Sequence, residues 1–250
     1  MRLGIMQPYF FPYPGHFGLI SAVEEWVVFD VTQYTPKSWM NRNRVLHPTE
    51  GTSWISVPLA NSSISIPTRD ARILNPKAAR QSILGKLTHY KPEVRRRRYD
   101  LVCSLVDAAF GDDADDSLVA LNTRGLSVCC ERLGFSFRYR ICSTLELDFP
   151  DHLGAGGWAP FICARLGATS YVNPLGGQAL FNPDAFSRIG VELLFAATDT
   201  LHYDQGRYAP EPNLSILDAL MWNDPAWIAD AIRGGTTLRA TEQSGHNNRV

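Results

Sequence analysis

The sequence predicts an α/β fold, with a mostly parallel sheet flanked by helices and a helix-rich middle segment. Two observations lead to this prediction. Short apolar runs typical of strands alternate along the chain with longer stretches of helical period. Gly134 and Gly167 each follow the last residue of a predicted helix and precede a β-rich run, the usual junction between a helix and a strand.

The predicted elements follow from this periodicity and from the turn residues that interrupt it. Strands are expected at residues 2–6, 26–30, 53–58, 136–142, 169–173 and 191–196. Helices are expected at residues 15–23, 76–90, 92–109, 115–133, 156–166, 183–188, 214–222 and 225–232.

One α/β domain is expected over residues 1–233. Within it, residues 76–133 are rich in predicted helix and are broken only at Lys91-Pro92 and by an acidic loop at 111–116, so they could form a small helical subdomain. Residues 234–250 hold almost no apolar side chain and are expected to be a disordered tail.

Composition excludes several classes of protein. The net charge of the 250-residue chain is −1, so neither nucleic acid nor an anionic membrane is an expected partner. We find no signal peptide and no apolar span long enough to cross a membrane, which favours a cytoplasmic protein. The five cysteines are odd in number and lack CxxC spacing, so buried thiols are expected.

Polar residues follow the ends of five predicted strands. In a parallel sheet these positions meet at the carboxyl edge, where open α/β sheets bind ligands. The sequence therefore predicts a shared site there, although ordinary loop polarity is the alternative. The residues are Gln7, then Asp30 and Gln33, then Cys142-Ser143-Thr144, then Asn173 with Gly176 and Gly177, and finally His202 to Gln205.

The rigid loop of prolines and aromatics from Gln7 to His16 ends in Pro-Gly-His before a helix, a geometry that suits an anion. His16 is either a donor to a phosphate or carboxylate or a surface residue of a capped turn. The spacing resembles the His-x-Gly-His loop of the nucleotidylyltransferase and pantothenate-synthetase superfamily. Tyr13 stands where that family has its first histidine, so a nucleotidyltransferase or ATP-dependent ligase is an alternative function.

Two basic clusters have different expected roles. Lys37 and Asn41-Arg42-Asn43-Arg44 concentrate cations and amides, and arginine forks suit phosphate or carboxylate. A solvated strand face is the alternative. The run Arg95 to Arg98 lies beside acidic residues and is interpreted as a solvated helix face, with a docking patch as the alternative.

No metal site is expected, because the histidines are scattered without a ligand spacing. Cys142 is the best-placed nucleophile, with His152 or His202 as its base, and a buried structural thiol is the alternative.

Several segments stand out in order over residues 3–224: 6–13, Asp30, 33–34, 39–44, 54–58, 143–147, 171–177 and 214–218. Together they resemble the WbqC-like protein family. The resemblance implies a role in O-antigen, capsule or natural-product biosynthesis, and acyl or aminoacyl transfer to an amine, for which the donor could be a carrier-protein thioester.

An amide-forming transferase needs a base and fixed donors to the tetrahedral oxyanion. The candidate bases are Asp30 and His202, and the candidate donors are Gln7 and Asn173. Arg42 and Arg44 would hold a phosphate, either of a sugar nucleotide or of the phosphopantetheine on an acyl carrier protein. Phosphopantetheine is the one cofactor expected. A non-catalytic scaffold protein of a biosynthetic assembly is the other alternative. The remaining predicted substrate contacts are His16, Gln33, Asn41, Gly176, Gly177 and Gln205.

Overall fold

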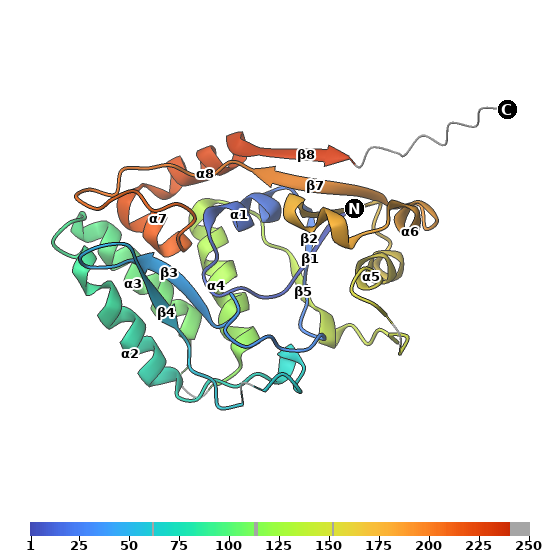
Figure 1. Cartoon of the computed structure of the whole chain (residues 1–250), viewed down its shortest axis with the longest axis horizontal. Helices are drawn as coiled ribbons and strands as arrows, with labels where there is room; N and C mark the ends of the chain where they lie inside the picture. Colours follow the sequence, from blue (N-terminus) through green and yellow to red (C-terminus); the bar gives the residue numbers. More distant parts are fainter. Residues whose placement is uncertain (62, 113–114, 152, 241–250) are drawn as a thin grey trace.

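The computed structural model describes residues 1–61, 63–112, 115–151 and 153–240, and its centre is a six-stranded sheet of order β5-β2-β1-β6-β7-β8 (Figure 1). The first five strands are parallel, and β8 runs antiparallel to β7. This confirms the predicted α/β fold with a mostly parallel sheet. The strands are β1 (Arg2–Met6), β2 (Glu25–Val28), β5 (Tyr139–Ile141), β6 (Ser170–Pro174), β7 (Glu192–Thr198) and β8 (Thr236–Ala240).

The chain reverses its direction of travel across the sheet beside β1. From β1 it moves outward to β2 and β5, and then returns to the other side of β1 to place β6 and β7. The carboxyl ends of β1 and β6 are therefore a topological switch point, where loops diverge and leave a crevice.

Helices cover both faces of the sheet (Figure 1). Side chains alternate along each strand, so Trp26 and Val28 enter one buried cluster with α1, α4, α7 and α8, while Val27 enters a second cluster with α5 and α6. The helices are α1 (Pro14–Ser21), α2 (Pro76–Leu87), α3 (Arg96–Phe110), α4 (Leu118–Leu133), α5 (Trp158–Leu166), α6 (Pro183–Ser187), α7 (Ile216–Trp222) and α8 (Pro225–Gly235). Short 3-10 turns lie at Thr68–Asp70, Thr88–Tyr90, Cys142–Thr144 and Leu175–Leu180.

A separate hairpin lies beside the sheet. Strand β3 (Arg42–Leu46) pairs antiparallel with β4 (Thr52–Ser56), and α2 and α7 pack against it. The predicted strand at 53–58 thus exists but belongs to this hairpin, whose other strand was not predicted. The helix-rich segment formed by α2, α3 and α4 shares its buried cluster with α1 and α8.

The predicted disordered tail is wrong at its start. Gly234 and Gly235 end α8, and Thr236–Ala240 form β8 against β7. The few apolar residues there, such as Leu238, suffice because β8 is an edge strand whose pairing supplies backbone hydrogen bonds. The rest of that tail, residues 241–250, lies outside the described residues. Within the described part, no helix has the length and apolar character needed to cross a membrane.

Candidate functional site

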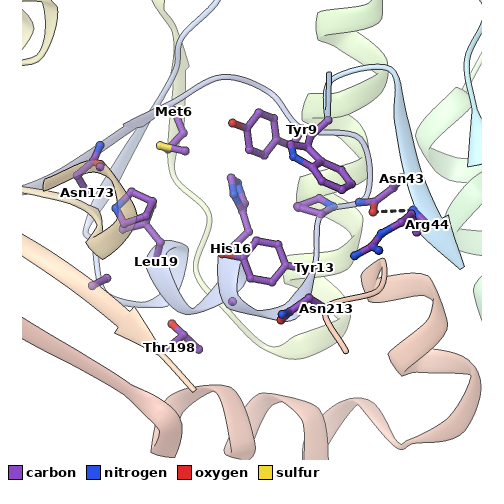
Figure 2. A pocket seen from close by; sticks show the side chains of 16 residues that line it. Met6, Tyr9, Tyr13, His16, Leu19, Asn43, Arg44, Asn173, Thr198 and Asn213 are labelled. Atoms are coloured by element: carbon purple, nitrogen blue, oxygen red, sulfur yellow. Dashed lines mark hydrogen bonds between the residues drawn. The ribbon is translucent and has the colours of Figure 1, made fainter. Parts of the chain in front are cut away.

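A cavity of about 510 Å³ opens at the carboxyl ends of β1 and β6, on the face that α1 covers (Figure 2). Met6, the last residue of β1, and Asn173, near the end of β6, both line it. The cavity therefore occupies the switch point of the sheet, the position at which α/β folds bind ligands. Its polar lining includes Tyr9, Tyr13, His16, Asn43, Arg44 and Asn173.

One wall of this cavity is the loop between β1 and α1, which is held by hydrogen bonds to its carbonyl groups. The Nδ2 of Asn43 donates to the carbonyl oxygens of Phe10 and Phe11 at 3.1 and 2.7 Å. Phe11 has a φ of 39°, in the left-handed region that costs a non-glycine residue about 1–2 kcal/mol. Three further groups donate to carbonyl oxygens of this loop. The amide of Asn122 donates to Pro8, the hydroxyl of Ser215 donates to Phe11, and the backbone N–H of Ile216 donates to Pro12.

His16 projects from α1 into the cavity, and Figure 2 shows its imidazole between Met6, Tyr9 and Tyr13. The side chain is only 3% exposed, and burial lowers its pKa to about 3. Its Nε2 is buried and has no hydrogen-bond partner among the described residues. His16 is therefore a neutral ring at physiological pH, able to exchange a hydrogen bond with a ligand but unable to offer a positive charge.

Two phenols line the same cavity. Burial raises the pKa of Tyr9, and the neighbouring Tyr13 raises it further; burial also raises the pKa of Tyr13. Both side chains therefore keep their hydroxyl protons at neutral pH and can donate hydrogen bonds to a bound molecule.

Arg42 and Arg44 stack on exposed tryptophans beside the cavity. The Cζ atom of Arg42 is 4.1 Å from the centre of the Trp54 ring, and the Cζ atom of Arg44 is 5.9 Å from that of Trp39. Within the described ranges neither guanidinium has a carboxylate at ion-pair distance, and the Nε atoms of both are buried without a hydrogen-bond partner. Two preoriented and unpaired guanidinium groups favour an anionic ligand.

A second cavity of about 160 Å³ lies on the opposite face of the sheet, beneath α5. Met6, Tyr9 and Asn173 line both cavities and so form a shared wall. Gln7 lines the smaller one, which brings together the two predicted amide donors, Gln7 and Asn173.

Asn173 is held in place by close neighbours. Its Nδ2 donates to the hydroxyl of Tyr171 at 2.7 Å, which leaves one N–H free. A Cβ atom on Gly177 would come within 2.2 Å of Asn173 Oδ1, so Gly177 is needed for close packing against this amide. Gly176 is exposed and has nothing near its Cα that a side chain would meet.

Asp30 and Cys142, two of the predicted catalytic residues, line neither cavity. Asp30 is 1% exposed, and its two oxygens accept hydrogen bonds from the N–H and the hydroxyl of Ser143 at 2.9 and 2.6 Å. Burial and the nearby Asp30 raise the pKa of the Cys142 thiol to about 12. The hydrogen bonds between Asp30 and Ser143 join the ends of β2 and β5. The raised pKa keeps the Cys142 thiol protonated at neutral pH.

The third predicted catalytic residue, His202, is exposed and lines neither cavity. Gln205 is buried and clamps a loop, because its amide accepts from the N–H of Glu211 and donates to that residue's carbonyl. Gln33 is exposed, and its backbone bridges to Pro67. Asn41 donates to the carbonyl of Val57 at 3.2 Å. His152, named as an alternative base, lies outside the described residues.

Sequence reasoning missed Tyr9, Tyr13, Asn43, Thr198 and Asn213 as cavity-lining residues. A signal for Asn43 existed, since residues 41–44 alternate between amide and guanidinium as the two faces of a strand do. Thr198 and Asn213 had no such signal. Over the described ranges, no group of three or more histidine, cysteine or acidic side chains is placed to hold a metal ion.

Comparisons with known proteins agree with the resemblance seen in the sequence. The model of the WbqC-like protein family matches residues 7–229. The chain is 25% identical over 234 residues to the uncharacterized protein Rv1507c of Mycobacterium tuberculosis (strain ATCC 25618 / H37Rv), a match that covers 93% of this chain and 97% of that protein. No solved structure matches the chain.

Proposed function

The chain belongs to the WbqC-like protein family, and from that premise we propose that it transfers an acyl or aminoacyl group to an amine in polysaccharide or natural-product biosynthesis. The observation that carries the proposal is the charge of the larger cavity. Arg44 is its charged side chain, His16 is neutral, and none of the described residues that line it is an acid.

This charge pattern suits an amine nucleophile. An amine attacks a carbonyl only when it is unprotonated, and a nearby guanidinium without a compensating carboxylate favours the neutral form. The unpartnered imidazole of His16 can then accept a hydrogen bond from the amine and orient its lone pair.

The shared wall supplies donors for the other reactant. In the transfer, the amine nitrogen attacks the carbonyl carbon of a thioester, a C–N bond forms, and the C–S bond breaks. The amine proton passes to the departing thiolate, so no further reactant is needed. The free N–H groups of Gln7 and Asn173 are suited to the tetrahedral oxyanion formed between these steps.

Arg42 and Arg44 give the donor or acceptor a phosphate site. The unpaired guanidinium groups of Arg44, which lines the cavity, and of Arg42, which lies two residues away on β3 and outside the lining, suit the phosphate of phosphopantetheine on a carrier protein, or the diphosphate of a sugar nucleotide. Nucleotidyl transfer of the His-x-Gly-His type is less favoured, because it calls on His16 to carry a positive charge that burial removes. A non-catalytic scaffold does not explain a cavity of about 510 Å³ at this edge of the sheet.

Titration calorimetry with 4′-phosphopantetheine and with UDP tests the phosphate site. We expect at least one probe to bind, and Arg44→Ala to weaken its binding about 10-fold to 100-fold, since hydrogen bonds to charged groups contribute about 1.5–3 kcal/mol. Arg132→Ala, on an exposed arginine of α4, is the matched control and should change nothing. Absence of binding at millimolar ligand, or equal affinity in Arg44→Ala, contradicts the proposal, and binding of ATP and CTP alone favours the nucleotidyltransferase.

A further inference from the structure

We propose that the smaller cavity is the acyl pocket of this site and that it favours a small apolar acyl chain of about four to six carbons. The inference rests on the proposed transfer reaction and names its donor class.

The position of the smaller cavity fits this role. It lies on the opposite face of the sheet from the Arg44 cavity, and among the described residues Met6, Tyr9 and Asn173 line both. An acyl carbonyl held at this wall can point its chain into the smaller cavity while an amine approaches from the larger one. The reacting atoms would then lie between the two chambers.

The chemistry of the lining fits an apolar group. Most of the described lining residues are apolar or aromatic, among them Ile5, Phe29, Trp158, Ala159, Leu180 and Phe181. None of the described residues that line the cavity carries a charge. An aminoacyl group would bring an ammonium ion with no carboxylate to receive it, which is costly in such a place. The lining therefore selects a plain acyl group over an aminoacyl group.

The polar atoms of the lining are grouped where a carbonyl would lie. Gln7 is half-buried and makes no side-chain hydrogen bond within the described part of the chain, and Asn173 keeps one free N–H. Gln7 directly follows β1 and Asn173 lies near the end of β6, two neighbouring parallel strands at the centre of the sheet. Both amides can receive the acyl oxygen while the chain lies among the aromatic rings.

The volume of the cavity sets the length of the chain. A dry apolar cavity of about 150 Å³ holds a molecule the size of benzene, with six carbons. The smaller cavity, at about 160 Å³, therefore matches the size of a butanoyl, 3-methylbutanoyl or hexanoyl chain, and the end of an octanoyl chain would extend past the exposed side chains of Ala155 and Leu180 into solvent. In the transfer the thioester C–S bond breaks, the amide C–N bond forms, and the free thiol leaves with the proton of the amine.

The test uses acetyl, butanoyl, 3-methylbutanoyl, hexanoyl and octanoyl thioesters of N-acetylcysteamine, probes that carry no phosphate. Binding to the full-length protein is measured by saturation-transfer NMR titration. We expect the affinity to rise about threefold to fourfold for each added carbon up to hexanoyl, as burial of a methylene group implies, and to level off at octanoyl, whose last carbons stay in solvent. A steady rise through octanoyl, or equal affinity for all chains, overturns the proposal.

Two variants that fill the cavity sharpen the test. Ala159→Leu adds bulk on α5, and Ala155→Leu adds it from the exposed loop before α5, where folding is not at risk. Each should shift the preferred chain towards acetyl and weaken hexanoyl binding at least 10-fold. Ala164→Leu, an exposed position on the same helix, is the matched control and should change nothing. If Ala155→Leu and the control Ala164→Leu prefer the same chain length, the proposal is contradicted.

The result also separates this inference from the proposed function. Chain-length selectivity without transfer to any amine would support the acyl pocket and contradict the proposed function. Amide formation that does not depend on chain length would do the reverse.

Discussion

The side-chain amide of Asn43 donates to the carbonyl oxygen of Phe11 at 2.7 Å, and Phe11 has a positive φ of 39°. Asn43 belongs to the hairpin and Phe11 to the loop after β1, so this bond joins two walls of the larger cavity. The same amide also donates to Phe10, and its oxygen accepts the N–H of Arg44 at 2.8 Å, the dashed line in Figure 2. One buried amide thus holds the loop in a strained conformation.

Asn43→Ala should lower the free energy of unfolding by about 2–4 kcal/mol, because two buried carbonyl groups lose their donor. Urea unfolding followed by circular dichroism measures the change. Asn41→Ala, which removes one longer hydrogen bond to Val57 two residues away, should cost less than half as much. Equal losses in the two variants would show that the hydrogen bonds of Asn43 have no special part in holding the loop.

The main sheet could be predicted because its strands are apolar runs separated by helices of clear period. Strand β3 could not, since Asn41-Arg42-Asn43-Arg44 has little strand propensity and exists as a strand only through its pairing with β4. Strand β8 likewise depends on β7, which lies about forty residues away along the chain. Whether β3 and β8 form strands therefore depends on pairing with other segments, and the local sequence of each gives no sign of that pairing.

The site could be predicted only in part. The carboxyl ends of β1 and β6 lie side by side, as a parallel sheet requires, and Gln7 and Asn173 both line the smaller cavity. The direction of a side chain was not available from the sequence. Asp30 follows β2 as predicted, yet both of its oxygens are taken by Ser143. His16 lines the larger cavity, but its burial, and therefore its neutral ring, depends on packing against Tyr9 and Trp26, which the sequence does not reveal.

The buried His16 should make the protein sensitive to acid. Its pKa is lowered to about 3 in the folded state, whereas an unfolded histidine titrates near 6.5. Between these values the unfolded chain binds the extra proton, so stability is lost as the pH falls below about 6.5. The loss from this group between pH 7.5 and pH 5 is about 2 kcal/mol.

His16→Phe keeps the ring and removes the titration, so its loss of stability between pH 7.5 and pH 5 should be about 2 kcal/mol smaller than that of the unaltered protein. Urea unfolding at the two pH values gives the difference. His202→Gln, at an exposed position, serves as control and should behave like the unaltered protein. An unchanged difference in His16→Phe would mean that the imidazole is hydrated in solution.

Asp218 should have the opposite dependence on pH. It is fully buried, its oxygens accept the hydroxyl groups of Tyr90 and Tyr203, and burial raises its pKa to about 6. Because the folded pKa exceeds the unfolded value near 4, the contribution of this carboxyl is fully present below pH 4 and is lost as the pH rises through 6.

Asp218→Asn mimics the protonated carboxyl at every pH. Its stability relative to the unaltered protein should therefore improve by about 2 kcal/mol from pH 4 to pH 7, whatever fixed cost the substitution has. Urea titrations across this range measure the relative stability. If the difference between the two proteins is constant with pH, the two tyrosine hydroxyls keep the carboxylate ionised in spite of its burial.

Asp30→Asn tests the catalytic role that the sequence suggested for this residue. The new amide would present N–H groups to the N–H or hydroxyl of Ser143, so unfolding should become easier by about 1–3 kcal/mol. Binding of phosphopantetheine or UDP should stay within twofold, because Asp30 lines neither cavity. Loss of transfer activity with unchanged stability would instead identify Asp30 as the base.

Gly177→Ala should disturb the wall between the two cavities. The new Cβ would lie 2.2 Å from Asn173 Oδ1, too close for any contact, so the amide must turn away from its bond to Tyr171. We expect weaker binding of the acyl thioesters, by about tenfold, if one donor to the carbonyl is lost. Gly176→Ala is the matched control, since nothing lies near its Cα and its loop is otherwise the same. Thioester titrations of both variants, with urea unfolding to verify that each is folded, decide the matter: equal binding in the two would exclude Asn173 from the acyl site.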